Sequence, residues 1–157
     1  MGREVNIGEL GKNPILAAIE PEALQFIAFS AETRPLRAGD VLFRLGDASH
    51  DGFVVLSGSI ALDPSGEGSV VARIVRPPAL IGELALLTET HRPATAIARE
   101  PSAVLRISRQ LFHRALQEFP QSAVHLQEWL SMNLKQFMND LGAVREALSR
   151  IGQSEAK

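Results

Sequence analysis

The spacing of hydrophobic residues divides the chain into three zones. Between residues 33 and 107, short apolar runs alternate with turns rich in glycine, aspartate and proline. The runs cover residues 41–43, 53–56, 60–62, 70–75, 95–98 and 103–107. Many short strands at this spacing are typical of an all-β barrel or jelly roll rather than of alternating β-α-β units. We therefore predict a mainly β fold, a β-jelly-roll barrel (double-stranded β-helix), with helices before and after it.

The first zone predicts two N-terminal helices. Asn13 is a favourable helix cap and Pro14 a favourable first helical residue. Pro21 begins a second helix that carries Leu24 and Ile27. Residues 1–12 lack the apolar core of a signal peptide, and we expect a flexible N-terminus there.

The third zone predicts a short helix over residues 111–119 and a long one over residues 120–152. Apolar residues of the long helix are spaced alternately by four and three positions: Leu130, Leu134, Phe137, Leu141, Val144, Leu148 and Ile151. This spacing of about 3.5 residues favours a coiled-coil seam between two copies of the chain. The alternative is a helix packed along its own barrel. We thus expect a flexible N-terminus (1–12), a barrel domain with N-terminal helices (13–119), a dimerisation or lid helix (120–152) and a flexible tail (153–157).

The composition of the chain limits the classes of function that it can have. A chain of 157 residues suits one domain, and its formal net charge of -2 provides no basic field for nucleic acid. The chain has no cysteine, which fits a reducing, cytoplasmic compartment, and no apolar run approaches the ~18 residues that cross a bilayer. Its four histidines show no metal-ligand spacing, and no nucleophile elbow or phosphate-loop lysine occurs. We predict no enzyme, no metal and no direct contact with DNA.

Residues 82–95 carry the clearest chemistry. Gly82 lets the backbone approach a ligand closely, and a helical turn over residues 83–87 would direct free amides toward an anion. Glu83 could accept a hydrogen bond from a sugar hydroxyl, while Arg92 could donate to a phosphate oxygen. Taken singly, Glu83 would be an ordinary first-turn carboxylate and Arg92 an exposed partner of Glu89. Their occurrence together favours a phosphoribose site.

This segment resembles the phosphate-binding cassette of the cyclic nucleotide-binding domain family, which includes the catabolite activator protein and protein kinase A regulatory subunits. The matching residues are Gly82, Glu83, Leu84, Ala85, Leu86, Arg92, Ala94 and Thr95. The resemblance extends over residues 36–119, where Asp51 and the hairpin glycines are expected to serve turn geometry without touching ligand.

The resemblance implies a ligand and a set of contacts. Phosphate and ribose would be bound by Gly82, Glu83, Leu84, Ala85, Arg92 and Ala94, with Val71, Ile74 and Thr95 near the base. The ligand would be cAMP, the commoner one among bacterial members, rather than cGMP. In the family, the helix after the barrel moves when ligand fills the cassette.

Two departures from the family pattern concern the same site. Pro93 stands where members usually have Ala, Ser or Thr, and proline offers neither an amide nor a hydroxyl to the phosphate. Residues 76–79 also lack the glycine that commonly precedes the cassette. We predict a stand-alone cyclic-nucleotide sensor that signals through its C-terminal helix. The alternative is a homodimerising interaction module that keeps the fold and does not bind nucleotide.

Overall fold

The computed structural model describes residues 7–66 and 72–133. Its strands form two four-stranded antiparallel sheets. The first sheet has the order β1 (Glu32–Leu36), β8 (Ser102–Ser108), β3 (Asp51–Ser57) and β6 (Leu80–Ile81). The second has the order β2 (Val41–Phe43), β7 (Thr95–Ala98), β4 (Ile60–Asp63) and β5 (Arg73–Val75). The expected jelly-roll arrangement is confirmed, although the described strands form two open sheets rather than a closed barrel.

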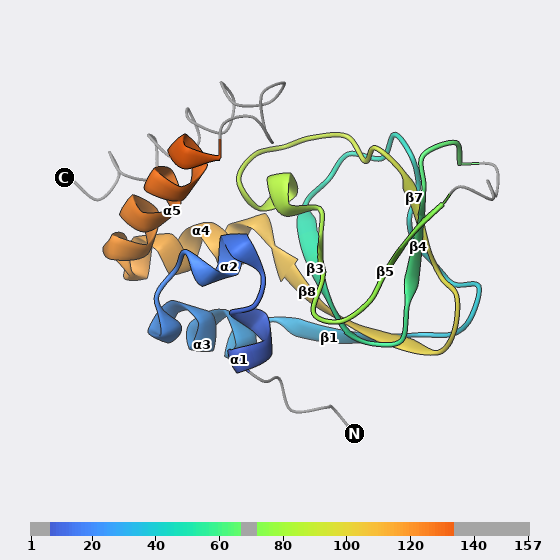
Figure 1. Cartoon of the computed structure of the whole chain (residues 1–157), viewed down its shortest axis with the longest axis horizontal. Coiled ribbons are helices and arrows are strands. Elements are labelled where there is room, and N and C mark those ends of the chain that lie inside the picture. The colour runs from blue at the N-terminus through green and yellow to red at the C-terminus, as the bar shows by residue number, and fades with distance from the viewer. Residues whose placement is uncertain (1–6, 67–71, 134–157) are drawn as a thin grey trace.

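Helices cover one end of this sandwich (Figure 1). Three precede the strands: α1 (Ile7–Leu10), α2 (Pro14–Ala17) and α3 (Pro21–Ser30). Two follow them: α4 (Arg109–Glu118) and α5 (Pro120–Met132). The 3-10 helix η1 (Glu83–Leu86) connects β6 to the segment that leads into β7.

Strands β3 and β8 are buried on both faces because they lie between two hydrophobic clusters. Phe53, Val55 and Val104 face the second sheet, while Val54 and Leu105 face the helices. Successive apolar side chains of β3 and β8 therefore pack alternately into the two clusters, as expected for strands whose successive side chains point to opposite faces. This central sheet fixes the position of the helices relative to the second sheet.

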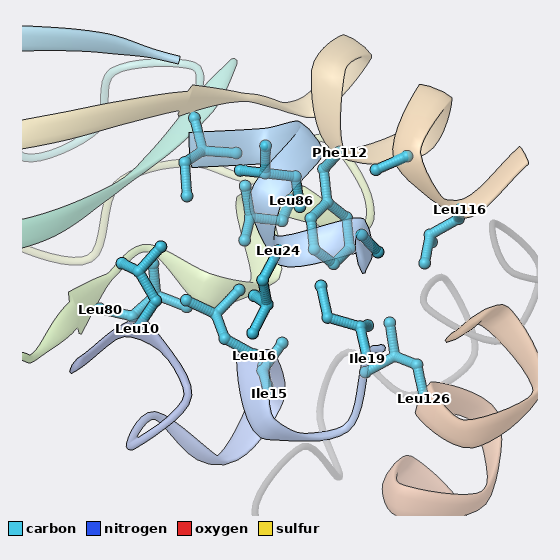
Figure 2. Packing of buried hydrophobic residues seen from close by; sticks show 14 of the residues in the cluster. Leu10, Ile15, Leu16, Ile19, Leu24, Leu80, Leu86, Phe112, Leu116 and Leu126 are labelled. Atoms are coloured by element: carbon cyan, nitrogen blue, oxygen red, sulfur yellow. The ribbon is translucent and has the colours of Figure 1, made fainter. Parts of the chain in front are cut away.

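The helical cluster is built from apolar side chains of all five α-helices and of η1 (Figure 2). Leu10 of α1 is 1% exposed, so part of the segment expected to be a flexible N-terminus is packed into the core. Asn13 caps α2, as predicted, by accepting from the amides of Ile15 and Leu16. Leu86 of η1 and Phe112 of α4 are both fully buried in this cluster, which links the cassette to the first helix after the strands.

The start of one helix differs from the sequence prediction. The helix expected over residues 111–119 begins at Arg109, because the Ser108 side chain caps it by accepting from the amide of Leu111 at 3.0 Å. A separate helix then begins at Pro120, where a proline is tolerated in the first turn. The Ser122 hydroxyl accepts from the amide of Glu20 at 2.9 Å, which ties α5 to the loop before α3.

The predicted dimer seam falls mostly outside the described residues. Leu130, its first member, is 2% exposed and packs in the hydrophobic core of its own chain. The remaining members lie beyond residue 133: Leu134, Phe137, Leu141, Val144, Leu148 and Ile151. Over residues 7–66 and 72–133, no helix combines the length and apolar character needed to span a bilayer.

Candidate functional site

Gly82 stands at the entrance of the cassette with a left-handed backbone. Its φ of 76° is readily adopted only by glycine, and it turns the chain from β6 into η1, the single helical turn that the sequence predicted. A Cβ atom at this position would lie 2.5 Å from Nη1 of Arg92. Glycine therefore does two things here, because it allows the turn and leaves room for a guanidinium against the backbone.

The turn uses one of the amides that we expected to face a ligand. The amide of Ala85 donates to the carbonyl oxygen of Gly82 at 3.0 Å and closes the first 3-10 turn. Leu86 and Leu87, both fully buried, anchor the turn in the helical cluster. The cassette is thus held by apolar packing on one side and is open to a cavity on the other.

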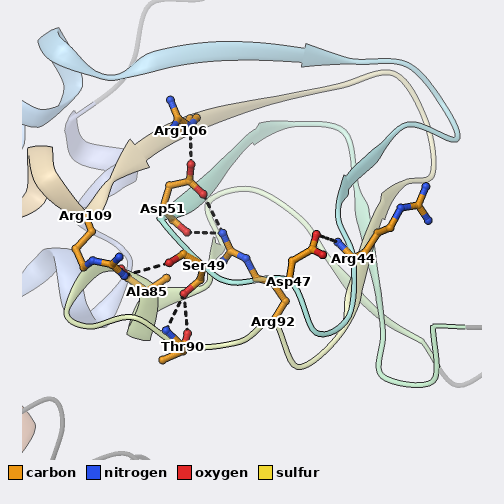
Figure 3. A network of polar contacts seen from close by, with 9 residues as sticks. All are labelled: Arg44, Asp47, Ser49, Asp51, Ala85, Thr90, Arg92, Arg106 and Arg109. Carbon is orange, nitrogen blue, oxygen red and sulfur yellow. Dashed lines mark hydrogen bonds and ion pairs between the residues drawn. The ribbon is translucent and has the colours of Figure 1, made fainter.

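Arg92 is buried, with an exposed fraction of 5%, and its partner is Asp51 rather than Glu89 (Figure 3). Its Nη2 donates to the carbonyl oxygen of Asp51 at 2.8 Å and to Oδ1 of the same residue at 2.9 Å. Sequence reasoning assigned Asp51 to turn geometry alone. Instead, its carboxylate orients the arginine, and no local signal reveals this because the two residues are 41 positions apart.

Asp51 is shared between two arginines. Its other carboxylate oxygen, Oδ2, accepts from Nε of Arg106 at 2.5 Å. Arg106 also approaches Glu32 at 3.6 Å, at the more exposed rim of the first sheet. One carboxylate is thus shared between two guanidinium groups, of which Arg92 is the more deeply buried.

Two donors of this buried arginine have no partner. Nε and Nη1 of Arg92 make no hydrogen bond with any group of residues 7–66 and 72–133. Leaving a buried charged donor unpaired is costly, on the order of 1–3 kcal/mol or more. Unpaired buried groups therefore call for an explanation, and an anion that binds beside Arg92 supplies one.

A cavity of about 540 Å³ opens beside these donors, within the ~300–1,000 Å³ typical of small-ligand sites. Every residue assigned to phosphate and ribose lines it: Gly82, Glu83, Leu84, Ala85, Arg92 and Ala94. Pro93 lines it as well, and the wall opposite the cassette comes from Phe43, Leu62, Arg73 and Val75. The structure thus brings the predicted cassette residues together around one hollow.

The base-proximal residues are placed differently from the expectation. Ile74 and Thr95 do not line the cavity, and Val71 lies outside the described residues. Side chains alternate along a strand, so Ile74, paired with Ala61, faces away while its neighbours Arg73 and Val75 face inward. The Thr95 hydroxyl instead accepts from the amide of Leu45 at 2.9 Å. Neither residue therefore belongs to the cavity lining.

For each of the two ionisable groups of the cassette, burial and neighbouring charge shift the pKa in opposite directions. Burial raises the pKa of Glu83, and the positive charge of Arg73 opposes this shift. Burial lowers the pKa of Arg92, mainly against the attraction of Asp51. Binding an anion would favour the charged arginine, and a hydroxyl donor would favour the ionised glutamate. Among the described residues no group of three or more histidine, aspartate or glutamate side chains is arranged to hold a metal.

A comparison with protein-family models matches residues 33–119 to the cyclic nucleotide-binding domain. The chain belongs to the cyclic nucleotide-binding domain family. This family is a regulatory one, and the match covers the strands of both sheets together with the cassette and α4.

Individual relatives of this cyclic nucleotide-binding domain differ widely in length. It is 31% identical over 127 residues to lysophospholipase nte1 of Neurospora crassa, covering 80% of this chain and 8% of that protein. The chain thus spans about 8% of the length of the curated relatives it matches. A cyclic nucleotide-binding-like protein of Brucella abortus is 38% identical, with a TM-score of 0.65, over 71% of this chain and 97% of its own.

A more distant structure shares the fold and contains a ligand. The regulatory domain of Toxoplasma gondii PKA, solved with cAMP, is 22% identical and superposes with a TM-score of 0.63. The alignment covers 69% of this cyclic nucleotide-binding domain and 42% of the Toxoplasma chain.

Replacing Gly82→Ala should destabilise the domain more than replacing Gly39→Ala. Both glycines have positive φ, which costs alanine roughly 1–2 kcal/mol, but a Cβ at Gly39 meets no atom within 4 Å. At Gly82 the collision with Arg92 should add about 1–3 kcal/mol. Urea unfolding of both variants measures the difference. Equal losses of stability in the two variants would show that Arg92 does not depend on the absence of a side chain at Gly82.

Proposed function

We propose that this domain binds a cyclic nucleotide, cAMP rather than cGMP, in the cavity beside Arg92 and signals binding through α4 and the C-terminal helix. The observation that supports it most is a buried guanidinium that lines a cavity of ligand size and has two donors without a hydrogen-bond partner among the described residues. A cyclic phosphate carries one negative charge, which would complement the buried guanidinium of Arg92.

Each part of the ligand has a complementary wall. The phosphate would accept from Nε and Nη1 of Arg92 and approach the backbone at Gly82, where no side chain intervenes. The ribose hydroxyl would donate to Glu83, and the base would lie toward Leu62 and Val75. Because Pro93 lacks the hydroxyl that a guanine-selective threonine would bring, nothing at that position favours cGMP.

Pro93 sets the expected strength of binding. It removes one amide donor to the phosphate, which costs ~1.5–3 kcal/mol, or about 10–200-fold in affinity. Arg92 can offset part of this loss because its free donors carry charge. The cAMP-bound Toxoplasma relative supports cAMP as the ligand through shared fold.

Contacts between the cassette and α4 provide a route for the signal. Nη1 of Arg109, the first residue of α4, donates to the carbonyl oxygens of Ser49 and Ala85, each at 3.2 Å. A ring nitrogen of His113 lies 3.3 Å from the carbonyl oxygen of Leu87. A ligand that alters the cassette would change these bonds, and its different affinity for two helix positions would shift their populations.

Calorimetric titration with cAMP and with cGMP tests ligand binding. We expect cAMP to bind, and Arg92→Ala to weaken it by at least ~10–200-fold through the loss of charged donors. Arg44→Ala removes an exposed arginine outside the cavity lining and serves as the control. No binding heat and no thermal shift at millimolar nucleotide, with Arg92 intact, would refute the proposal.

Affinity for cAMP should decrease as pH is lowered. The ionised form of Glu83 accepts the ribose hydroxyl, and its pKa is raised by burial, so protonation begins at a higher pH than for an exposed glutamate. Between about pH 7.5 and pH 5, the dissociation constant should rise by up to ~10-fold per pH unit below that pKa. In Glu83→Gln this rise should disappear, because the glutamine amide does not titrate. If the dissociation constant of cAMP changed with pH in the same way in the parent chain and in Glu83→Gln, Glu83 would be excluded as the titrating group.

We also propose that the C-terminal helix joins two copies of the chain through the seam from Leu134 to Ile151. Its heptad spacing supports this proposal. Sedimentation equilibrium should give a dimer for the chain and a monomer for Leu141→Glu, with Gln136→Glu as the control on a polar position. A monomeric parent chain would contradict it. A dimer whose affinity ignores cAMP would instead favour the interaction module without nucleotide.

A further inference from the structure

A β-bulge in β2 turns the side chain of Phe43 toward the ligand cavity. Val41 pairs with Ile97 of β7, and the register then shifts so that Phe43 pairs with Ala96. Without the shift, Phe43 would share the outer face with Val41, which is 38% exposed. Ala96 is fully buried on the inner face, so the extra residue in β2 reverses the direction of the phenylalanine.

The ring that is turned inward lies over the guanidinium of Arg92. Cζ of Arg92 is 4.2 Å from the centroid of the Phe43 ring and 5.7 Å from that of Phe53. The two rings are 6.0 Å apart. A cation within about 6 Å of an aromatic face is attracted to it, and more strongly where water is excluded. Arg92 meets that condition because it is 5% exposed.

Stacking on the ring and pairing with Asp51 constrain the guanidinium in different ways. Asp51 holds Nη2 at one corner of the planar group, which leaves rotation about that corner open. The Phe43 ring lies over Cζ at 4.2 Å and limits this rotation from a second side, without offering a hydrogen-bond acceptor atom. Nε and Nη1 consequently keep their donors for an anion.

We propose that Phe43 is a positioning residue for ligand binding: its ring fixes the plane of the Arg92 guanidinium so that Nε and Nη1 meet the ligand phosphate. This inference rests on the proposed nucleotide-binding function. Its importance is increased here by Pro93, which removes a backbone donor and leaves more of the phosphate binding to the arginine.

The test compares Phe43→Leu, Phe43→Tyr and a variant with trifluorophenylalanine at position 43, which keeps the ring shape but withdraws its π electrons. Calorimetry with cAMP should show about 2–30-fold weaker binding for Phe43→Leu and for the fluorinated variant, and near-parental binding for Phe43→Tyr. Phe26→Leu is the matched control, because Phe26 is also half-buried and packs edge-on against Phe119 without a cation on its face.

A second readout does not depend on ligand. In nitrogen-15 NMR spectra of the free protein, the Nε–H resonance of Arg92, assigned by its absence in Arg92→Lys, should be displaced by the ring current. It should move in Phe43→Leu, stay in Phe43→Tyr and be unaffected by Phe26→Leu. A role in packing alone would lower the stability of both leucine variants without weakening cAMP binding.

The outcomes separate this inference from the function on which it rests. Unchanged cAMP affinity in Phe43→Leu, or in the fluorinated variant, while the parent binds, overturns the role of Phe43 and leaves the function standing. An Arg92 resonance that does not respond to Phe43→Leu also overturns it. If the parent chain does not bind cAMP or cGMP, the function fails and the ligand role of Phe43 fails with it.

Discussion

The arrangement of this domain depends on a guanidinium that has been removed from water. Arg92 is almost fully buried, and such a charge is tolerated only where the protein supplies compensation. Asp51 supplies a carboxylate and a carbonyl oxygen, and Arg106 holds the same carboxylate from its other side. The compensation is incomplete, since Nε and Nη1 have no hydrogen-bond partner among the described residues. An anion bound beside Arg92 would supply the missing partner.

Each layer of the fold contributes one constraint to this arginine. The first sheet brings Asp51 at the start of β3 beside Arg106 of β8, through their antiparallel register. The second sheet contributes the face of Phe43. The helical cluster buries Leu86 and Leu87, which holds the cassette turn so that Gly82 lies against the guanidinium. A charged group can be positioned this closely because three independently packed elements meet around it.

The same packing joins the site to the helices. The cassette turn is anchored in the cluster that also contains Phe112 of α4 and Leu126 of α5. Arg109 and His113 add hydrogen bonds from α4 to carbonyl oxygens near the turn. A shift of the cassette turn is therefore opposed or favoured by the position of α4. This coupling is the physical basis on which ligand binding could be transmitted from the cavity to the helices.

Local pattern determined the jelly-roll class and the cassette turn, because turn chemistry and short strands are encoded by neighbouring residues. Resemblance to a known family predicted that Gly82, Glu83 and Arg92 would lie around one cavity. Only the tertiary structure decided which side chains face that cavity. The two-residue period of a strand makes a shift of one position reverse the face, so Arg73 and Val75 line the cavity while Ile74 between them does not. The bulge that brings in Phe43 and the contact of Asp51 with Arg92 both arise between segments about 40 to 55 positions apart, where sequence spacing carries no information about distance.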